Sequence, residues 1–441
     1  MADERVGVIG LGYVGLPLAV AFAEVGLEVS GVDVDAGKVA MLMAGRSPIR
    51  DVPEEALRAA LESGRFRATT DYGALAGVEA VLICVPTPYD AMRAPDLSYV
   101  RAAAEGLVPH LRRGHLVILQ STTYPGTTEE VVRPILERGG LRAGEDFDLA
   151  FSPERIDPGN REWTVRNTPK VVGGITARST ARAAALLERL GAPVYRVSSP
   201  RVAEMSKLLE NIFRSVNIAL VNELALLCER MGIDIWEVIE AAKTKPFGFM
   251  AFYPGPGVGG HCIPVDPYYL SWKAREYDFY TKFIELAAEV NQGMPFHVVE
   301  KVEEALDRYE RRGLRGARVL VLGVAFKREV DDARNSPAER IMELLLARGA
   351  EVAYHDPYVP RFQAGGSRFY REIVEWESVP LEEGWLRWAD VVLIVTGHRA
   401  VDYPKVVATA RLVVDTCNAT AGIPSGSARI VRLGAPWPDA H

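Results

Sequence analysis

The stretch that decides the fold is Val6-Gly7-Val8-Ile9-Gly10-Leu11-Gly12-Tyr13-Val14-Gly15, where an apolar run passes into the pattern GxGxxG. A helical pattern follows over residues 16–25, and residues 28–32 then alternate as a second strand. Strand, glycine-rich turn, helix and strand in this order predict a βαβ unit. Its glycines let the backbone turn tightly and approach a pyrophosphate at the helix N-terminus.

Asp33 ends the second of these strands. A carboxylate at that position accepts hydrogen bonds from the ribose hydroxyls of a dinucleotide and repels a 2′-phosphate. The sequence therefore predicts NAD, rather than NADP, as the cofactor.

The rest of the chain repeats the alternation of strands and helices around a helical middle. The predicted fold class is α/β, with two Rossmann-like doubly wound lobes joined by a long central helix and a helical middle domain. The expected domains are residues 1–200, 201–312 and 313–441. Strands are expected at residues 80–85, 116–120, 149–151, 318–322, 351–354, 391–395 and 412–415, and helices at 99–111, 128–138, 235–242, 282–308 and 337–347.

Residues 201–230 form one long helical pattern with apolar residues on more than one face, so one side is expected to pack on a second subunit. Lys207 and Asn211 lie one turn apart, and Ser215 and Asn222 continue roughly the same polar stripe. A helical lysine is usually a solvated surface charge. Within an otherwise apolar helix, the stripe instead favours the wall of a site, with Lys207 as an oxyanion stabiliser.

Cys262 follows a loop with six glycines and prolines, Pro254-Gly255-Pro256-Gly257-Val258-Gly259-Gly260-His261-Cys262. Bare backbone of this kind suits close approach to a ligand. A free thiol titrates near about 8.5, so a nucleophilic role requires a neighbouring cation or donor. The structural alternative is a buried loop cysteine, with Asp266 as a turn former; for His261 the structural interpretation is favoured.

Three further loops follow strands: residues 85–88, 121–126 and 152–155. The carboxyl ends of parallel strands form the edge where doubly wound sheets bind ligands. Ordinary turn chemistry is the alternative for each loop taken alone.

Composition excludes several classes of protein. The 441 residues carry 51 basic and 58 acidic side chains, a net charge of −7, with no long basic run, so a nucleic-acid partner is not expected. Four cysteines without a CxxC pair favour a reducing compartment. The N-terminus has no signal-peptide order and no run of 18 apolar residues follows, which predicts a cytoplasmic protein without a membrane partner. No metal site is expected.

Together these motifs resemble the UDP-sugar 6-dehydrogenases, in family order over residues 1–430. Within that family the chain is most similar to the UDP-N-acetylhexosamine type, and above all to the UDP-N-acetylglucosamine type. The motifs that carry the resemblance are GLGYVGLP (10–17), VPTP (85–88), STTYPGTT (121–128), SPER (152–155), the helix with Lys207 and Asn211, GGHCIPVDP (259–267) and AFK (325–327) followed by Arg334.

The resemblance implies a four-electron oxidation of the C6 alcohol of a UDP-sugar to a carboxylate, with two NAD molecules reduced in turn, for polysaccharide precursor synthesis. Cys262 would form a thiohemiacetal that is oxidised to a thioester. Lys207 and Asn211 would stabilise oxygen charge at C6, and Asp266 would assist the base chemistry. Glu154 and Thr122 would position the hydrolytic water.

The resemblance also implies the binding residues. It assigns the C-terminal lobe to the UDP moiety, while the apolar faces of the long central helix predict a homodimer. The expected NAD-binding residues are Gly10, Gly12, Tyr13, Val14, Gly15, Asp33, Pro86, Thr87, Ser121, Thr122 and Arg334. The expected substrate-binding residues are Glu154, Arg155, Lys207, Asn211, Gly259 and Lys327.

Three departures from the relatives that act on UDP-glucose favour an N-acetylhexosamine. Pro158 replaces a second glutamate, His261 precedes the cysteine in place of tyrosine or serine, and residues 245–250 lack an arginine. UDP-N-acetylglucosamine is expected first, followed by the galacto and manno epimers, with UDP-glucose as a further alternative.

Two other functions fit parts of the sequence: a β-hydroxyacid dehydrogenase and a non-catalytic NAD sensor. NADH formed per UDP-sugar consumed should be two for the proposed enzyme, one for the first alternative and zero for the second.

Overall fold

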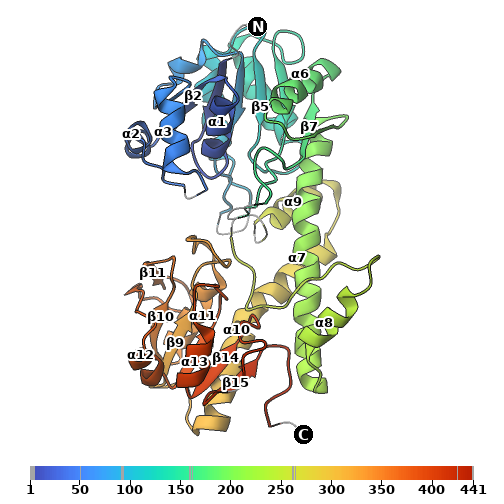
Figure 1. The fold of residues 1–441 in the computed structure, drawn as a ribbon. Coiled ribbons are helices and arrows are strands. Elements are labelled where there is room, and N and C mark those ends of the chain that lie inside the picture. Colours follow the sequence, from blue (N-terminus) through green and yellow to red (C-terminus); the bar gives the residue numbers. More distant parts are fainter. Residues whose placement is uncertain are drawn as a thin grey trace. The chain divides into compact units, whose positions relative to one another are not determined.

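A computed structural model describes residues 5–49, 51–90, 94–157, 160, 162–260, 263, 265–424 and 426–439. The chain divides into two compact units (Figure 1). The N-terminal unit comprises Met1–Glu210 with Tyr268–Tyr280, and the C-terminal unit comprises Asn211–Pro267 with Thr281–His441.

The N-terminal unit is built on an eight-stranded sheet of order β3-β2-β1-β4-β5-β6-β7-β8. β1 pairs in parallel with both β2 and β4, and only β6 and β7 are antiparallel. The strands are β1 (Arg5–Ile9), β2 (Glu28–Val32), β3 (Phe66–Thr69), β4 (Ala80–Ile83), β5 (Leu116–Leu119), β6 (Asp148–Phe151), β7 (Lys170–Gly174) and β8 (Val194–Arg196).

Helices cover this sheet. Val8, Leu82 and Ile118 pack in one core cluster with α1, α3 and α6, and every residue of β4 and β5 is buried, as expected for a parallel sheet covered on both faces. The helical elements are α1 (Gly15–Glu24), α2 (Ala36–Met43), α3 (Glu54–Glu62), η1 (Tyr72–Leu75), α4 (Ser98–Leu107), η2 (Val108–His110), η3 (Thr128–Val132), α5 (Arg133–Leu136), η4 (Glu137–Gly139), α6 (Ala177–Glu188) and η5 (Arg275–Tyr277).

The C-terminal unit contains a second parallel sheet, of order β10-β9-β13-β14-β15, and the antiparallel hairpin β11–β12. Residues of α10 and α11 pack on one face of this sheet, and residues of α12 and α13 pack on the other. The strands are β9 (Arg318–Leu322), β10 (Glu351–His355), β11 (Arg361–Ala364), β12 (Val374–Glu377), β13 (Val391–Ile394), β14 (Leu412–Asp415) and β15 (Arg429–Arg432). The helices are α8 (Ile235–Lys243), α10 (Lys282–Glu310), α11 (Pro337–Ala347), α12 (Glu383–Trp388) and α13 (Tyr403–Thr409).

Two helices run from one unit into the other along the chain, α7 (Pro200–Met231) and α9 (Asp266–Ala274). By length and composition α7 is the one helix among the described residues that is apolar enough to span a membrane. It nevertheless buries a charged and polar stripe, which is typical of a core helix. The stripe consists of Lys207, Asn211, Ser215 and Asn222.

The predicted α/β class with two Rossmann-like lobes is confirmed, and the expected strands and helices lie within a few residues of their predicted ends. Several elements were not predicted. They include β7 and the edge strand β8, the hairpin β11–β12, and α2, α6, α12 and α13.

Two glycines of the C-terminal unit test how tightly its sheet is packed. Gly323 and Gly316 both have left-handed backbone, with φ of +82° and +72°. A Cβ on Gly323 would lie 2.3 Å from the Thr396 carbonyl oxygen, whereas a Cβ on Gly316 would meet nothing within 4 Å. We expect Gly316→Ala to lower the free energy of unfolding by about 1–2 kcal/mol. Gly323→Ala should lower it by a further roughly 1–3 kcal/mol, because its Cβ also clashes. Chemical denaturation followed by tryptophan fluorescence measures both, and equal losses would contradict the packing argument.

Candidate active site

The glycine-rich turn between β1 and α1 is shaped for close approach of a ligand. A Cβ on Gly10 would lie 2.6 Å from the Cys84 carbonyl oxygen, and a Cβ on Gly15 would lie 1.8 Å from the Gly10 carbonyl oxygen. A Cβ on Gly12 would meet nothing within 4 Å. The first and third glycines are therefore required by packing, and the second leaves open backbone at the helix N-terminus. These residues fit a dinucleotide pyrophosphate.

Asp33 follows β2 beside this turn and is buried. One carboxylate oxygen accepts hydrogen bonds from the Leu11 backbone N–H (2.9 Å) and the Lys38 ammonium (2.8 Å), and the other accepts from the Asp35 N–H (3.0 Å). Burial alone would raise the pKa of Asp33, but these hydrogen bonds outweigh burial and leave its pKa lowered. The group is thus an ionised acceptor where a ribose would bind.

The loops after β4 and β5 are tied together at the same edge of the sheet. Ser121 donates from Oγ to the Val85 carbonyl oxygen at 2.7 Å, and Tyr269 donates to the Pro88 carbonyl oxygen at 3.1 Å. Thr122 is half-buried beside Ser121.

Glu204 of α7 fixes the end of the second loop. Its buried carboxylate accepts from the Gly126 N–H (2.6 Å), the Thr128 N–H (2.9 Å) and the Thr128 hydroxyl (2.7 Å). Burial still raises the pKa of Glu204. The segment that carries Ser121 and Thr122 is therefore anchored to the helix that carries Lys207.

Glu154 follows β6 and forms a buried ion pair with Lys170, the first residue of β7. Sequence reasoning missed Lys170. Arg155 lies beside Glu154; its guanidinium contacts the Pro169 carbonyl oxygen (2.8 Å) and Glu210 (2.7 Å).

The predicted site residues of α7 differ in their partners. Lys207 is only 7% exposed and has no hydrogen-bond or ion-pair partner among the described residues. One turn later, Asn211 donates from Nδ2 to an Asp266 carboxylate oxygen at 2.5 Å, and both side chains are buried. A buried ammonium without a partner is costly, so Lys207 marks a position for an anionic or partly anionic group.

The lower part of the polar stripe is structural. Asn222 donates to Asn291 Oδ1 (2.9 Å) and accepts from the Gly255 N–H (3.0 Å), while Asn291 donates to the Ser215 carbonyl oxygen (3.1 Å). These bonds join α7, α10 and the start of the glycine- and proline-rich loop. The interpretation of the whole stripe as a ligand wall therefore does not extend to Asn222, and at Ser215 the bond involves only the backbone carbonyl oxygen.

Cys262, His261 and Pro158 lie outside the described residues. The other three cysteines, Cys84, Cys228 and Cys417, are free thiols, and burial raises the pKa of each. None of them is placed to be a thiolate at neutral pH.

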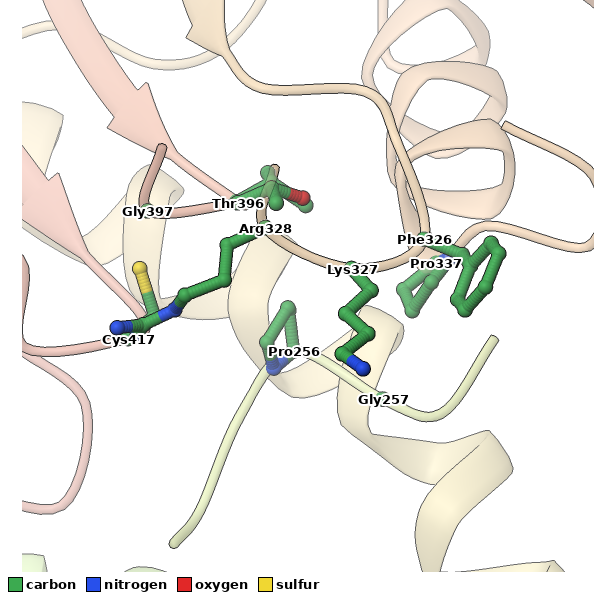
Figure 2. A pocket seen from close by; sticks show the side chains of 10 residues that line it. Pro256, Gly257, Phe326, Lys327, Arg328, Pro337, Thr396, Gly397 and Cys417 are labelled. Carbon is green, nitrogen blue, oxygen red and sulfur yellow. The ribbon is translucent and has the colours of Figure 1, made fainter. Parts of the chain in front are cut away.

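A pocket of about 140 Å³ lies in the C-terminal unit, at the carboxyl ends of β9 and β13 (Figure 2). β9 lies between β10 and β13, so this is the point where the strand order reverses. Lys327 and Arg328 provide its positive charge. The lining residues are Pro256, Gly257, Phe326, Lys327, Arg328, Pro337, Val395, Thr396, Gly397 and Cys417.

Gly259 borders this region, and Arg334 precedes Asn335 in the segment that Gly259 packs on. A Cβ on Gly259 would lie 2.8 Å from both the Asn335 carbonyl oxygen and Phe326 Cβ, so the loop before Cys262 needs a glycine to pack here. The guanidinium of Arg334 donates to both carboxylate oxygens of Asp332, at 2.8 and 2.6 Å.

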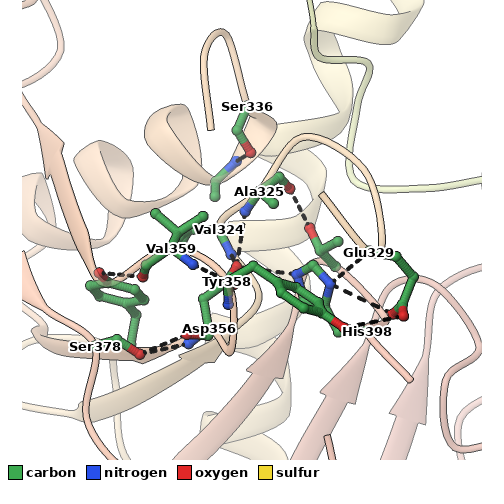
Figure 3. Close-up of polar contacts among 12 residues, drawn as sticks. Val324, Ala325, Glu329, Ser336, Asp356, Tyr358, Val359, Ser378 and His398 are labelled. Carbon is green, nitrogen blue, oxygen red and sulfur yellow. Dashed lines mark hydrogen bonds and ion pairs between the residues drawn. The ribbon is translucent and has the colours of Figure 1, made fainter. Parts of the chain in front are cut away.

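A buried polar network holds the two walls of the pocket together (Figure 3). Asp356 follows β10, in the same place in its lobe as Asp33, and accepts from the Val324 N–H (2.7 Å), the Ala325 N–H (3.1 Å) and His398 Nε2 (3.1 Å). His398 Nδ1 accepts from the Glu329 N–H at 3.0 Å. Burial would raise the pKa of Asp356, but the hydrogen bond from His398 and those from the backbone donors leave its pKa lowered.

Comparison with known proteins identifies the family. Residues 4–191 match the NAD binding domain of the UDP-glucose/GDP-mannose dehydrogenase family, residues 201–293 its central domain and residues 320–422 its UDP binding domain. A UDP-N-acetyl-D-glucosamine 6-dehydrogenase from Pseudomonas aeruginosa is 41% identical over 361 residues, which cover 81% of this chain and 84% of that protein. The chain belongs to this family.

Further relatives carry other sugar names. An NDP-N-acetyl-D-galactosaminuronic acid dehydrogenase from Ralstonia nicotianae is 35% identical over 94% of this chain and 95% of its own length. The solved structure of a UDP-D-ManNAc dehydrogenase from Pyrococcus horikoshii has a TM-score of 0.88 and 32% identity, and covers 98% of this chain and 99% of that chain. The predicted resemblance is confirmed: the chain is an NAD-dependent UDP-sugar dehydrogenase, an oxidoreductase with a UDP binding domain.

Cofactor choice in this dehydrogenase should depend on Asp33. We expect Asp33→Ala to lower the preference for NAD over NADP, measured as the ratio of kcat/KM values, by about 10–100-fold, the value of one to two hydrogen bonds to a charged group. The substitution removes the clash with a 2′-phosphate and releases the Lys38 ammonium. Lys38→Met, which keeps the carboxylate, is the control and should still prefer NAD. Equal use of NADP by the unmodified enzyme would contradict the assignment.

Proposed function

We propose that this dehydrogenase oxidises the C6 alcohol of a UDP-N-acetylhexosamine, with UDP-N-acetylglucosamine as the preferred substrate, to the uronic acid through a thioester on Cys262. The balanced reaction consumes one water and two NAD⁺ and yields the uronate, two NADH and three protons. Polysaccharide precursor synthesis is the role proposed for the product.

The observation that carries the proposal is the buried ammonium of Lys207, which has no partner among the residues that the structure describes. Negative charge develops on the C6 oxygen when the alcohol loses its proton and again in the tetrahedral adducts. A fixed cation away from water stabilises such charge strongly. Asn211 adds a donor one turn away, and its bond to Asp266 orients the amide. Asp266 is proposed to assist removal of the alcohol proton.

Cys262 is the proposed nucleophile. NAD, when bound by the glycine-rich turn and Asp33, accepts a hydride from C6 in each oxidation. Between the two oxidations, the thiolate of Cys262 adds to the aldehyde carbon and gives the tetrahedral centre from which a hydride can leave. The raised pKa of the other three thiols supports assignment of this role to Cys262.

Hydrolysis of the thioester is assigned to Glu154 and Thr122. Glu154 stands at the carboxyl end of β6 and Thr122 follows β5, the neighbouring strand. A carboxylate at this edge can take a proton from water while the hydroxyl orients it. Because Pro158 stands where relatives acting on UDP-glucose have a second glutamate, Glu154 is the single carboxylate proposed for this step.

The UDP moiety is proposed to bind the C-terminal unit, partly in the pocket of Figure 2. Lys327 and Arg328 carry charge suited to a diphosphate, and Gly259 leaves the cysteine loop close to the loop after β9. The pocket volume of about 140 Å³ suits one part of a sugar nucleotide, since pockets for drug-sized ligands occupy roughly 300–1,000 Å³.

We also propose a homodimer through α7, acting in the cytoplasm. Exposed apolar side chains follow one another along this helix at spacings of three, four and seven residues, and large exposed apolar patches mark interfaces. Free thiols at the described cysteines support the reducing compartment. The exposed residues are Met205, Leu209, Phe213, Leu220, Leu224, Leu227 and Met231.

Substrate choice should follow the acetamido group. We expect kcat/KM for UDP-N-acetylglucosamine to exceed that for UDP-glucose by at least about 100-fold, because a site built around the acetamide leaves polar groups unpaired with glucose. The galacto and manno epimers should fall between them, and each substrate oxidised should yield two NADH. Measurement of kcat/KM for the four UDP-sugars under the same conditions tests this order. UDP-glucose as the best substrate would overturn the proposal.

Replacement of the nucleophile should stop turnover. Cys262→Ser should still bind NAD and UDP-sugar but lose sustained NADH production by at least about 10³-fold, because a hydroxyl is a far weaker nucleophile than a thiolate at neutral pH. Cys228→Ala, at a buried cysteine, is the matched control and should keep activity. Near-normal turnover by Cys262→Ser would exclude the thioester.

A further inference from the structure

The ion pair between Lys170 and Glu154 is almost completely buried in the N-terminal unit. The Lys170 side chain is 1% exposed and that of Glu154 is 5% exposed. The Lys170 ammonium lies 3.2 Å from one carboxylate oxygen, Oε2, and 3.4 Å from the other, Oε1. Removing two charges from water costs several kcal/mol per ion, and an apolar pair of similar volume is often as stable. Stability alone therefore gives little reason for a lysine here.

The donors around Glu154 distinguish its two oxygens. Oε1 also accepts from the Arg155 N–H (2.8 Å) and the Ile156 N–H (3.1 Å), whereas Oε2 accepts from Lys170 alone among the described residues. The backbone donors and the lysine together fix the plane of the carboxylate. Oε2 is left with room for a further donor, such as a water molecule.

Unpaired polar groups are buried in loops of the same sheet edge. Gln120 Nε2, Thr123 Oγ1 and Ser152 Oγ are buried and have no hydrogen-bond partner within the described part of the chain. Gln120 and Thr123 follow β5. Ser152 follows β6, the strand that also leads to Glu154. Buried polar atoms without partners in a native protein normally bind water or a ligand. This edge is therefore suited to hold ordered water.

We propose that Lys170 is the positioning residue for thioester hydrolysis: it holds the Glu154 carboxylate turned so that Oε2 receives the proton of the attacking water. This inference rests on the proposed function. In the step, the water oxygen bonds to C6 and one water proton passes to Oε2. The C6–S bond then breaks, which releases the carboxylic acid and returns the thiolate of Cys262. Lys170 contacts neither substrate nor cofactor in this scheme.

The test separates oxidation from hydrolysis by stopped-flow measurement of NADH absorbance. Lys170→Met should keep a first-turnover burst of two NADH per active site, with a rate within about twofold of the wild type. The steady-state rate should fall at least tenfold, because the thioester accumulates. Glu154→Gln should behave in the same way, and the double variant should be no slower than Glu154→Gln. Lys170→Arg, which keeps the charge, should recover part of the steady-state rate.

Lys273→Met is the matched control, since Lys273 is also buried in the N-terminal unit and pairs with Glu130 (2.7 Å) and Glu276 (2.6 Å). It should lower the melting temperature without separating burst from steady state. If Lys170→Met fails to fold, the double variant with Glu154→Gln removes both charges together, and it must then match Glu154→Gln.

Three results would overturn the proposal. If Lys170→Met keeps the wild-type steady-state rate while Glu154→Gln is slow, the positioning role of Lys170 is excluded and the proposed role of Glu154 stands. Equal losses in burst and steady state show a general structural role. Wild-type hydrolysis by Glu154→Gln removes the proposed function at Glu154, and the role of Lys170 with it.

Discussion

Parallel pairing of one strand with two neighbours is the constraint on which each half of the molecule depends. β1 pairs with β2 and β4, and β9 pairs with β10 and β13. From the central strand, β1 or β9, the chain first connects to the neighbour on one side and later to the neighbour on the other side. The loops that follow adjacent strands therefore diverge at the carboxyl ends and leave space for a ligand. The glycine-rich turn lies at the first of these points and the pocket lined by Lys327 and Arg328 lies at the second. Position along the sheet, rather than residue type alone, makes these loops binding loops.

Buried charge distinguishes structural from chemical roles in this protein. Asp33, Glu204 and Asp356 each collect three or more donors, so their burial is compensated within the protein. Lys207 is buried to a similar degree, and the described part of the chain offers its ammonium no such partner. Since an isolated buried ion is destabilising by several kcal/mol in effective terms, uncompensated burial is expected where a ligand completes the set.

Local patterns were predictable from the sequence, and long-range partners were not. The glycine-rich turn, its two strands and the long helix follow from residues that are close in the chain, so their prediction was confirmed. Lys170 looks like the start of any short apolar strand, and its partner Glu154 is brought near by the antiparallel pairing of β6 with β7. Periodicity likewise placed Asn222 on a polar stripe but could not tell a ligand from Asn291 of another helix. The hairpin β11–β12 was not predicted because it has few buried apolar residues, Phe362 among them, and so shows little apolar pattern.

Asp356, at the end of β10, and Asp33, at the end of β2, occupy equivalent places in the two lobes but differ in their hydrogen bonds. Asp33 has three donors and retains capacity for more, whereas Asp356 receives five hydrogen bonds from its own lobe, the last two from the Tyr358 and Val359 N–H groups at 2.8 and 3.1 Å. A carboxylate offers about four lone-pair sites, so the second acid is saturated. Asp356 therefore has no free acceptor for a ribose diol of the kind that Asp33 can bind, although the acidic residue is kept. The two equivalent acids thus differ in how many of their acceptor sites the protein itself fills, and the His398 imidazole takes one of the sites on Asp356 that a ligand hydroxyl would need.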